Sequence, residues 1–276
     1  MCDTCGCNIT PGNRHLVTAG GALEKTATGR EAVDVLEGLL SANDHEAAHN
    51  REHLDGHGVL AINLMSSPGA GKTALLEATI DALGEEFSLA VVEGDLETEN
   101  DAARIRARGV PAVQISTGSA CHLDAHMVHS ALHELELATL DILFIENVGN
   151  LVCPASFDLG QHCNVTLLSV PEGDDKPAKY PVMFRAADLV LVTKSDLLPV
   201  LDDFDPDQAE GHVRALASTA PVLRLSARRG DGFDAWLGWL RAELDAHRER
   251  RASGATRRPA VQAEGAHLHA ADHSHP

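Results

Sequence analysis

The stretch VLAINLMSSPGAGKTALL, residues 59–76, decides the fold of this chain. It begins with an apolar run typical of a buried strand and ends with the apolar spacing of a helix. Between them, residues 66–73 match the Walker A pattern except at the first position, where Ser66 replaces glycine. Gly69 and Gly71 permit positive φ and let backbone N–H groups approach phosphate oxygens closely. The stretch therefore predicts a strand, a phosphate-binding loop and a helix.

Residues of this loop and of the helix start are expected to contact a nucleotide. Lys72 would neutralise the β- and γ-phosphates, and the Thr73 hydroxyl would coordinate Mg²⁺. An ordinary glycine turn between a strand and a helix is the alternative, and Gly-Lys-Thr at this junction argues against it. The predicted nucleotide-binding residues here are Gly69, Ala70, Gly71, Lys72, Thr73 and Ala74.

The composition restricts the partners and the location of the chain. Aromatic residues make up only 3% of its 276 residues, so the core must be aliphatic. A formal net charge of −19 argues against nucleic acids and anionic membrane surfaces as partners, and it suits the handling of cations. No apolar run approaches the ~18–20 residues of a membrane span, and the N-terminus has no signal-peptide pattern. These features predict a cytoplasmic protein.

Apolar segments of strand length alternate with helical patterns along the middle of the chain. This alternation predicts an α/β fold of the P-loop NTPase type, with a mainly parallel, doubly wound sheet and helices on both faces. Ligands of such sheets bind at the C-terminal ends of the strands. The strands are expected at residues 59–65, 88–93, 112–116, 141–146, 165–170, 188–193 and 221–225.

Two acidic residues follow predicted strands and are expected to act on the phosphates. Asp95 comes after the second strand, where it can hold Mg²⁺ or orient the attacking water, although it could instead cap the next helix. Glu146 ends an apolar strand, as a Walker B acid does. The predicted catalytic residues are Lys72, Asp95 and Glu146, and the predicted magnesium ligands are Thr73, Asp95 and Glu146.

The sequence Thr193-Lys194-Ser195-Asp196 predicts recognition of guanine. An Asp196 carboxylate would accept from guanine N1–H and from its exocyclic amine, donors that adenine lacks at those positions, while the Lys194 stem packs on the purine. Thr193 stands where guanine-binding proteins usually carry asparagine. Ser226 and Ala227 resemble a second loop, Ser-Ala-Lys, whose backbone N–H meets guanine O6. The expected nucleotide is GTP, and the expected domains are residues 1–57, a GTPase domain at 58–250 and a disordered tail at 251–276.

In the cytoplasm, cysteines are expected as metal ligands or core residues rather than disulfides. Cys2, Cys5 and Cys7 can surround one ion, and soft sulfur ligands favour Ni²⁺, Zn²⁺ or Cu(I). The alternative is a disordered tail with incidental cysteines. In the domain, loops at one sheet edge could bring Cys121, His122 and Cys153 around a metal or pair them between subunits; the alternative is buried thiols. Cys163 is expected to pack on a strand.

Histidines recur in three further places. From residue 31 to about residue 54 the spacing predicts a helix, and four histidines recur every fourth residue at its end, either as a solvated stretch or as i,i+4 metal chelates. Another group follows His122 on the next helix, where we expect a solvated or helix-packing face. The tail histidines are either metal buffers or incidental. These three sets are His45, His49, His53 and His57; His126, His129 and His133; and His267, His269, His273 and His275.

Several long segments resemble the HypB family, the nickel-inserting GTPases of [NiFe]-hydrogenase maturation. These segments are SSPGAGKT, VVEGDLET, CHLDA, FIENVGNLVCPASFDLG, EGDDKPAKYPVMF and TKSD, within residues 58–243, together with the Cys2–Cys7 motif. The resemblance implies a GTPase metallochaperone that dimerises with nucleotide. It also implies a tight nickel site at Cys2, Cys5 and Cys7, and a second site, for Ni²⁺ or Zn²⁺, at Cys121, His122 and Cys153 on the dimer interface.

The partners implied by the resemblance are a HypA-type nickel chaperone and the hydrogenase large-subunit precursor. Two alternatives remain. A urease- or cobalamin-type GTPase chaperone belongs to the same class, but the N-terminal cysteine motif and the Cys121-His122 pair argue against it. A nickel or zinc storage protein, with its sixteen histidines binding several ions, belongs to a different class.

Overall fold

The structure is a computed structural model that describes residues 30–95, 100–118, 120–216 and 218–259, with side chains from residue 40 onward. Cys2, Cys5, Cys7 and the tail histidines lie outside the described residues. None of the described helices is both long enough and apolar enough to cross a lipid bilayer.

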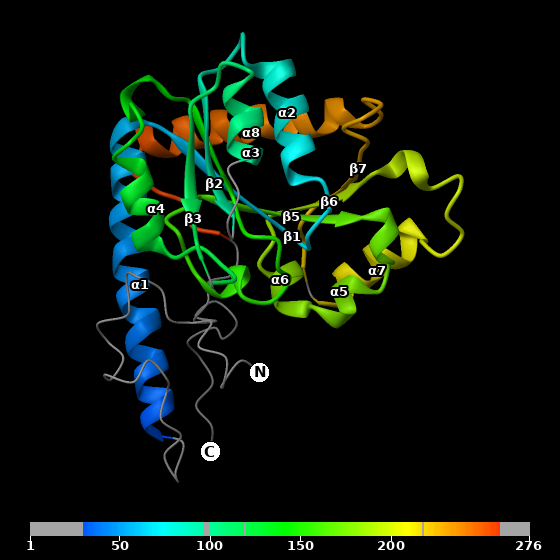
Figure 1. The fold of residues 1–276 in the computed structure, drawn as a ribbon, viewed down its shortest axis with the longest axis horizontal. Helices are drawn as coiled ribbons and strands as arrows, with labels where there is room; N and C mark the ends of the chain where they lie inside the picture. Colours follow the sequence, from blue (N-terminus) through cyan, green and yellow to red (C-terminus); the bar gives the residue numbers. More distant parts are fainter. Residues whose placement is uncertain (1–29, 96–99, 119, 217, 260–276) are drawn as a thin grey trace.

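A single seven-stranded, fully parallel sheet organises the chain (Figure 1), which confirms the predicted α/β class. Its strand order is β3-β2-β4-β1-β5-β6-β7, so the strand before the glycine loop lies between β4 and β5. At this point the strand order changes direction along the sheet, and open α/β sheets bind their ligands at such a switch point. The strands are β1 Leu60–Ser66, β2 Leu89–Asp95, β3 Ala112–Ser116, β4 Ile142–Glu146, β5 Cys163–Ser169, β6 Leu189–Thr193 and β7 Val222–Arg224.

Helices cover both faces of the sheet, as a doubly wound fold requires (Figure 1). One face packs against α2, α3 and α8, and the other against α1 and α4 at one end and α6 and α7 at the other. The helices are α1 Arg30–His57, α2 Lys72–Leu83, α3 Asn100–Arg106, α4 Ala125–Leu132, α5 Lys176–Lys179, α6 Pro181–Arg185, α7 Pro206–Ala215 and α8 Phe233–Ala252. Short 3₁₀ turns are η2 Leu137–Thr139, η3 Pro154–Ser156, η4 Val170–Glu172 and η5 Ser195–Leu197.

The core is aliphatic, as the low aromatic content predicts. Alternate residues of β1 point to opposite faces, so Ile62 packs in the cluster with α2 and α8 while Ala61 packs in the cluster with α1 and α4. Trp236 is fully buried on α8, and its indole N–H donates to the Thr79 hydroxyl of α2 at 2.9 Å. Cys163 is fully buried on β5, as predicted.

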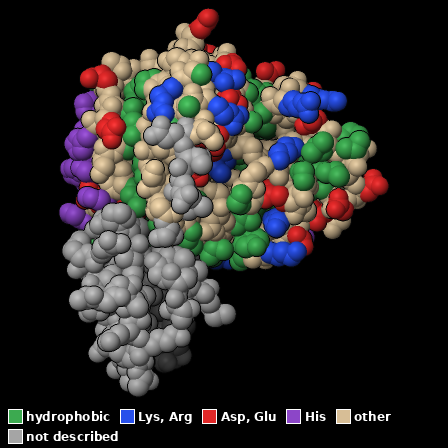
Figure 2. Space-filling model, in the orientation of Figure 1, with side chains coloured by type: hydrophobic (Ala, Val, Ile, Leu, Met, Phe, Trp, Pro, Cys, Tyr) green, Lys and Arg blue, Asp and Glu red, His purple; other side chains and the backbone are tan. Residues whose placement is uncertain are grey.

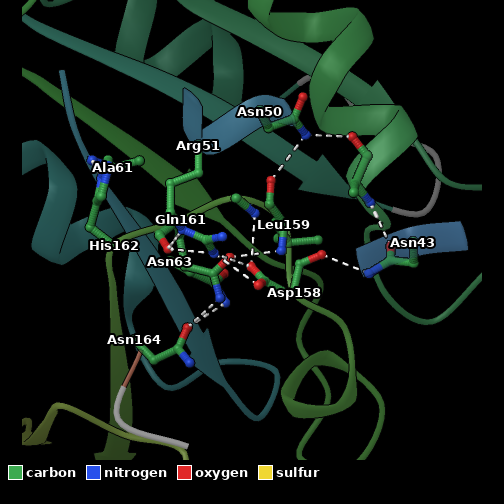
Figure 3. Close-up of polar contacts among 12 residues, drawn as sticks. Asn43, Asn50, Arg51, Ala61, Asn63, Asp158, Leu159, Gln161, His162 and Asn164 are labelled. Atoms are coloured by element: carbon green, nitrogen blue, oxygen red, sulfur yellow. Dashed lines mark hydrogen bonds and ion pairs between the residues drawn. The ribbon is translucent and has the colours of Figure 1, made fainter. Parts of the chain in front are cut away.

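Helix α1 runs to His57, beyond its predicted end near residue 54, and lies beside α4 along one edge of the molecule (Figures 1 and 2). Polar contacts attach it to the segment before β5 (Figure 3). The buried Arg51 guanidinium pairs with Asp158 at 2.6 Å, and Asn50 donates to the carbonyls of Ala125 and Leu159 at 2.8 and 3.1 Å. Each buried polar group of α1 named here has a partner, which fixes the helix in one position.

The described chain also continues past residue 250, where the sequence predicts the disordered tail to begin. Helix α8 ends at Ala252, and Arg257 then pairs with Glu243 and with Asp188, the latter at 2.9 Å. Arg257 therefore attaches residues 251–259 to the domain. The predicted disorder does not hold for these residues, because an arginine-rich sequence gives no sign of the buried Asp188 and the half-buried Glu243 that receive Arg257.

Gly160, in the segment before β5, lies close against α1. Its φ is +94°, and a Cβ there would lie 2.5 Å from Asn50 Cβ and 2.8 Å from the Ala47 carbonyl. Gly160→Ala should lower the free energy of unfolding by about 2–4 kcal/mol, because a left-handed backbone and an overpacked contact both disfavour alanine. Urea unfolding measures this.

Gly230→Ala is the matched control, since its φ is +82° with nothing within 4 Å of the added Cβ. It should cost only about 1–2 kcal/mol, the backbone part alone. Equal losses in the two variants would mean that the contact with α1 does not constrain the fold.

Candidate nucleotide and metal site

The glycine loop opens directly into α2 and presents backbone donors at its N-terminus. Gly69 and Gly71 have φ of 76° and 99°, and Gly71 caps α2 without a side-chain hydrogen bond. The buried Lys72 ammonium donates to Ser66 Oγ at 3.2 Å. Ser66, the departure from the Walker A pattern, therefore helps to position the lysine. A helix N-terminus with available N–H groups and an adjacent lysine is suited to phosphate.

Carboxylates from β2, β4 and α3 converge beside this lysine. Ligand oxygens of Glu93, Asp101 and Glu146 lie within 4.8 Å of one another, and Thr73 Oγ1 donates to Glu146 at 3.0 Å. Asp95 lines the same cavity at the end of β2, outside that group of three. Glu93 and Asp101 are candidate ligands that are not among the predicted magnesium ligands, although the segment that they bound is acidic. A glutamate inside the apolar run of β2 was the available signal.

Burial and crowding change the titration of the two glutamates. Burial, followed by the neighbouring Glu146 carboxylate, raises the pKa of Glu93 far above its ordinary value. Burial also raises the pKa of Glu146, while Lys72, Glu93 and Thr73 oppose that rise. The Oε2 atoms of both glutamates are buried with no hydrogen-bond partner among the described residues. The carboxylates and the Thr73 hydroxyl are hard oxygen ligands, which fit a Mg²⁺ ion.

Two neighbouring cavities follow the path from phosphate to base. The first, of about 390 Å³, is lined by the glycine loop, by Lys72 and Thr73, and by the carboxylates. The second, of about 260 Å³, is lined by Lys194, Asp196, Ser226 and residues around them. Gly71 and Ala74 line both cavities. The two predicted base loops therefore lie next to the phosphate loop.

Hydrogen bonds join the base loops to the glycine loop. The buried Thr193 hydroxyl donates to the Ala70 carbonyl at 2.7 Å, and Lys194 Nζ donates to the Gly69 carbonyl at 2.7 Å. Thr193 therefore serves the fold even though it departs from the usual asparagine. Ser226 Oγ donates to Asp196 at 2.7 Å, and this hydrogen bond lowers the pKa of the Asp196 carboxyl.

Cys121, His122 and Cys153 come together at the same edge of the sheet. The two sulfurs lie 3.0 Å apart, and Cys121 Sγ lies 3.8 Å from His122 Nδ1. The imidazole stacks on Phe157 with ring centroids 4.0 Å apart, and burial lowers the pKa of His122 to about 4. Its Nε2 is buried with no hydrogen-bond partner in the described chain. Two sulfurs and a neutral imidazole are ligands suited to Zn²⁺ or Ni²⁺.

The loop that leads to Cys153 also borders the nucleotide cavity, through Asn147, Val148 and Gly149. Asn150, just before Cys153, donates to the Cys121 carbonyl at 3.2 Å. Gly149 packs against the glycine loop so closely that a Cβ there would lie 2.9 Å from Pro68 Cα. Movement of the phosphate loop would therefore disturb the segment that connects Glu146 to Cys153.

Arg104 also lines the phosphate cavity, from α3, although the sequence does not distinguish it from other surface arginines. It pairs with Glu77 at 2.6 Å and with Asp101 at 2.8 Å. Its guanidinium is therefore already engaged by two carboxylates.

The strand, glycine loop, helix and converging acidic residues define a P-loop nucleotide-binding protein. A family model described as CobW/HypB/UreG, nucleotide-binding domain, matches residues 60–224. Curated relatives named hydrogenase maturation factor HypB are 54% identical in Azotobacter vinelandii, over 77% of this chain and 72% of the relative, and 49% identical in Escherichia coli K12, over 78% and 73%. The chain belongs to the HypB family of hydrogenase maturation factors.

Two solved structures share the fold. A structure described as HypB from Helicobacter pylori in complex with nickel has a TM-score of 0.70 and 42% identity, covering 78% of this chain and 97% of that one. A hydrogenase maturation factor HypB structure from Archaeoglobus fulgidus also has a TM-score of 0.70, with 39% identity, covering 74% and 100%.

The raised pKa of Glu93 gives a measurable dependence of stability on pH. Without nucleotide or metal, the folded protein keeps a proton that the unfolded chain releases above its ordinary pKa of 4.5. The free energy of unfolding should therefore fall as pH rises, by up to about 1.4 kcal/mol per pH unit from this group. Glu93→Gln should remove this loss, so its advantage over the wild type grows from pH 5 to pH 8 in urea unfolding.

Glu85→Gln, at an exposed position, is the control and should follow the wild type. A constant difference between Glu93→Gln and the wild type across this pH range would contradict a protonated Glu93.

Proposed function

We propose that the chain is a GTP-hydrolysing metallochaperone that binds nickel and delivers it to the precursor of the [NiFe]-hydrogenase large subunit. The observation that carries the proposal is the contact between two sites. Glu146, at the phosphates, and Cys153, beside Cys121, belong to one short segment that packs on the glycine loop. Membership of the HypB family and the nickel complex of the Helicobacter pylori relative support it.

Hydrolysis is assigned to the phosphate cavity. Lys72, positioned by Ser66, neutralises charge on the β- and γ-phosphates, and Lys72, Asp95 and Glu146 are the proposed catalytic residues. Thr73, Asp95 and Glu146, together with Glu93 and Asp101, would hold Mg²⁺, which supplies further charge neutralisation when bound. Because Arg104 is engaged by Glu77 and Asp101, turnover is expected to be slow, as in a molecular switch.

Base selection is assigned to the second cavity. Asp196, kept ionised by Ser226, accepts from guanine N1–H and from the exocyclic amine, while Lys194 lies beside the purine. Gly69, Ala70, Gly71, Thr73 and Ala74 contact the phosphates, and Ser226 and Ala227 border the base.

Nickel is the cargo, and it is assigned to two sets of ligands. Cys2, Cys5 and Cys7 form the tight site, and Cys121, His122 and Cys153 form the site whose affinity follows the nucleotide, with Zn²⁺ as a competing ion. We further propose nucleotide-dependent dimerisation, a HypA-type nickel chaperone as partner and a cytoplasmic location. A difference of ~1–3 kcal/mol between nucleotide states would change nickel affinity about 5–150-fold.

Asp196→Asn tests this function because it should change the preferred base of the nucleotide from guanine to xanthine. An asparagine amide can donate to the 2-oxo group of xanthine, whereas guanine presents a donor there, so the variant should lose at least about tenfold in GTP turnover and gain XTP turnover. Nickel release to a chelator should then respond to XTP in the variant and to GTP in the wild type.

Asp203→Asn, on an exposed loop, should keep the wild-type response to GTP. If Asp196→Asn keeps full GTP turnover, the base assignment fails. If the variant hydrolyses XTP but nickel release does not respond to it, the hydrolysis stands and the coupling to metal fails.

A further inference from the structure

A histidine cluster between α1 and α4 is left unused by the proposed function. Figure 2 shows histidine side chains gathered on one edge of the molecule, where Figure 1 places α1 beside α4. Ring contacts connect residues of both helices, with centroid separations of 5.1 Å for His49 and His129, 4.6 Å for His129 and His133, and 5.9 Å for His133 and His53. His49 and His133 are exposed, so the cluster is open to solvent.

The His129 and His133 rings are placed as a chelating pair. They lie one turn apart on or just after α4, and their Nε2 atoms are 3.0 Å apart. Two nitrogens that each bind one ion at about 2.1 Å lie about 3.0–3.4 Å apart at the usual bond angles. The pair therefore already has the separation that a shared ion requires.

The buried Asn50 fixes which nitrogen of His129 is available. Because the Asn50 amide nitrogen donates to the carbonyls of Ala125 and Leu159, its oxygen must face His129 Nδ1, 2.9 Å away. That oxygen only accepts, so Nδ1 carries the proton and the lone pair of the neutral ring lies on Nε2, toward His133. Metal-binding histidines are commonly oriented in this way by an acceptor behind the ring.

Helix α1 contributes residues on both sides of the His129 ring. Glu46 Oε1 lies 3.4 Å from His129 Nδ1, so this carboxylate is on the protonated side of the ring and helps to orient it. On the other side, His53 Nδ1 is buried with no hydrogen-bond partner among the described residues. Partial burial, followed by repulsion from neighbouring imidazoles, lowers the pKa of His53, which favours the neutral form that binds metal.

We propose that this cluster is a further binding site for a divalent transition metal, Ni²⁺ or Zn²⁺, with His129 and His133 as its chelating pair. Imidazole is a preferred ligand of both ions. The site is separate from Cys121, His122 and Cys153, although α4 begins shortly after His122.

A second histidine cluster, in the interior, differs from the cluster between α1 and α4 because both ring nitrogens of its His162 already have partners. His162 and His247 lie beside Asp55 in the interior, but His162 Nδ1 accepts from the Ala61 N–H at 2.9 Å and its Nε2 faces Asp55 at 3.2 Å. Both ring nitrogens of His162 are thus occupied by the fold. This buried cluster carries no ion site by the same criteria.

The test uses the full chain with the cysteine ligands and tail histidines replaced, so that only the cluster is left as a strong site. The background substitutions are Cys2→Ser, Cys5→Ser, Cys7→Ser, Cys121→Ser, Cys153→Ser, His267→Gln, His269→Gln, His273→Gln and His275→Gln. Calorimetric titration with Ni²⁺ should show one bound equivalent, and adding His129→Gln and His133→Gln should weaken it at least about tenfold. His212→Gln, on α7, should leave it unchanged.

Thermal unfolding is a second readout. Ni²⁺ should raise the melting temperature of the background protein and not that of the chain with His129→Gln and His133→Gln, since an ion bound by the folded arrangement of the pair stabilises the folded state. If the background protein does not fold, the same pair of substitutions in the otherwise unaltered chain should remove one nickel equivalent. Equal nickel binding with and without the pair, or an equal loss in His212→Gln, would overturn the proposal.

Discussion

Lys72 lies beside three carboxylates, Glu93 of β2, Glu146 of β4 and Asp101 of α3, and the rest of the site depends on how that charge is balanced. Glu93 and Glu146 are both nearly fully buried, and burying two like charges together is unfavourable unless a proton or a cation compensates. In the absence of ligand, the raised pKa of Glu93 supplies the proton. Magnesium and nucleotide would replace it, so ligand binding and the protonation of this pair are linked.

The strand order of the sheet explains how the phosphate cavity is connected to Cys121 and Cys153. Because β4 pairs with β1 in parallel, the chain that leaves β4 continues beside the glycine loop that follows β1. Gly149 makes that passage close, and Cys153 lies a few residues further on. The loop after β3 meets the same place through the Asp95 carbonyl, which accepts from Thr117 at 2.9 Å ahead of Cys121. The segment ahead of Cys153 therefore lines the phosphate cavity, and the segment ahead of Cys121 is hydrogen-bonded to Asp95, which lines it.

Much of this arrangement could be predicted from the sequence. Alternating apolar runs predicted all seven strands. Residues at or just after strand ends, such as Glu146 and Asp196, predicted the edge of the sheet at which the site residues gather. Long-range partners gave no local signal. Arg257 reaches Asp188 from far along the chain, and Asn50 selects the ring nitrogen of His129 only because two backbone carbonyls from other segments lie beside it. Glu93 could be predicted only in part. Its position in an apolar strand is evident from the sequence, but its proximity to Asp101 depends on the fold of α3.

The central claim is that the nucleotide controls metal affinity at Cys121, His122 and Cys153. The most direct test is nickel affinity by chelator competition, with GDP and with a non-hydrolysable GTP analogue, in the wild type, in Cys121→Ala and in the control Cys163→Ala, whose cysteine is buried on β5. The account predicts a difference between nucleotides that disappears in Cys121→Ala and persists in Cys163→Ala. Identical affinities with both nucleotides in the wild type would contradict it and favour metal storage.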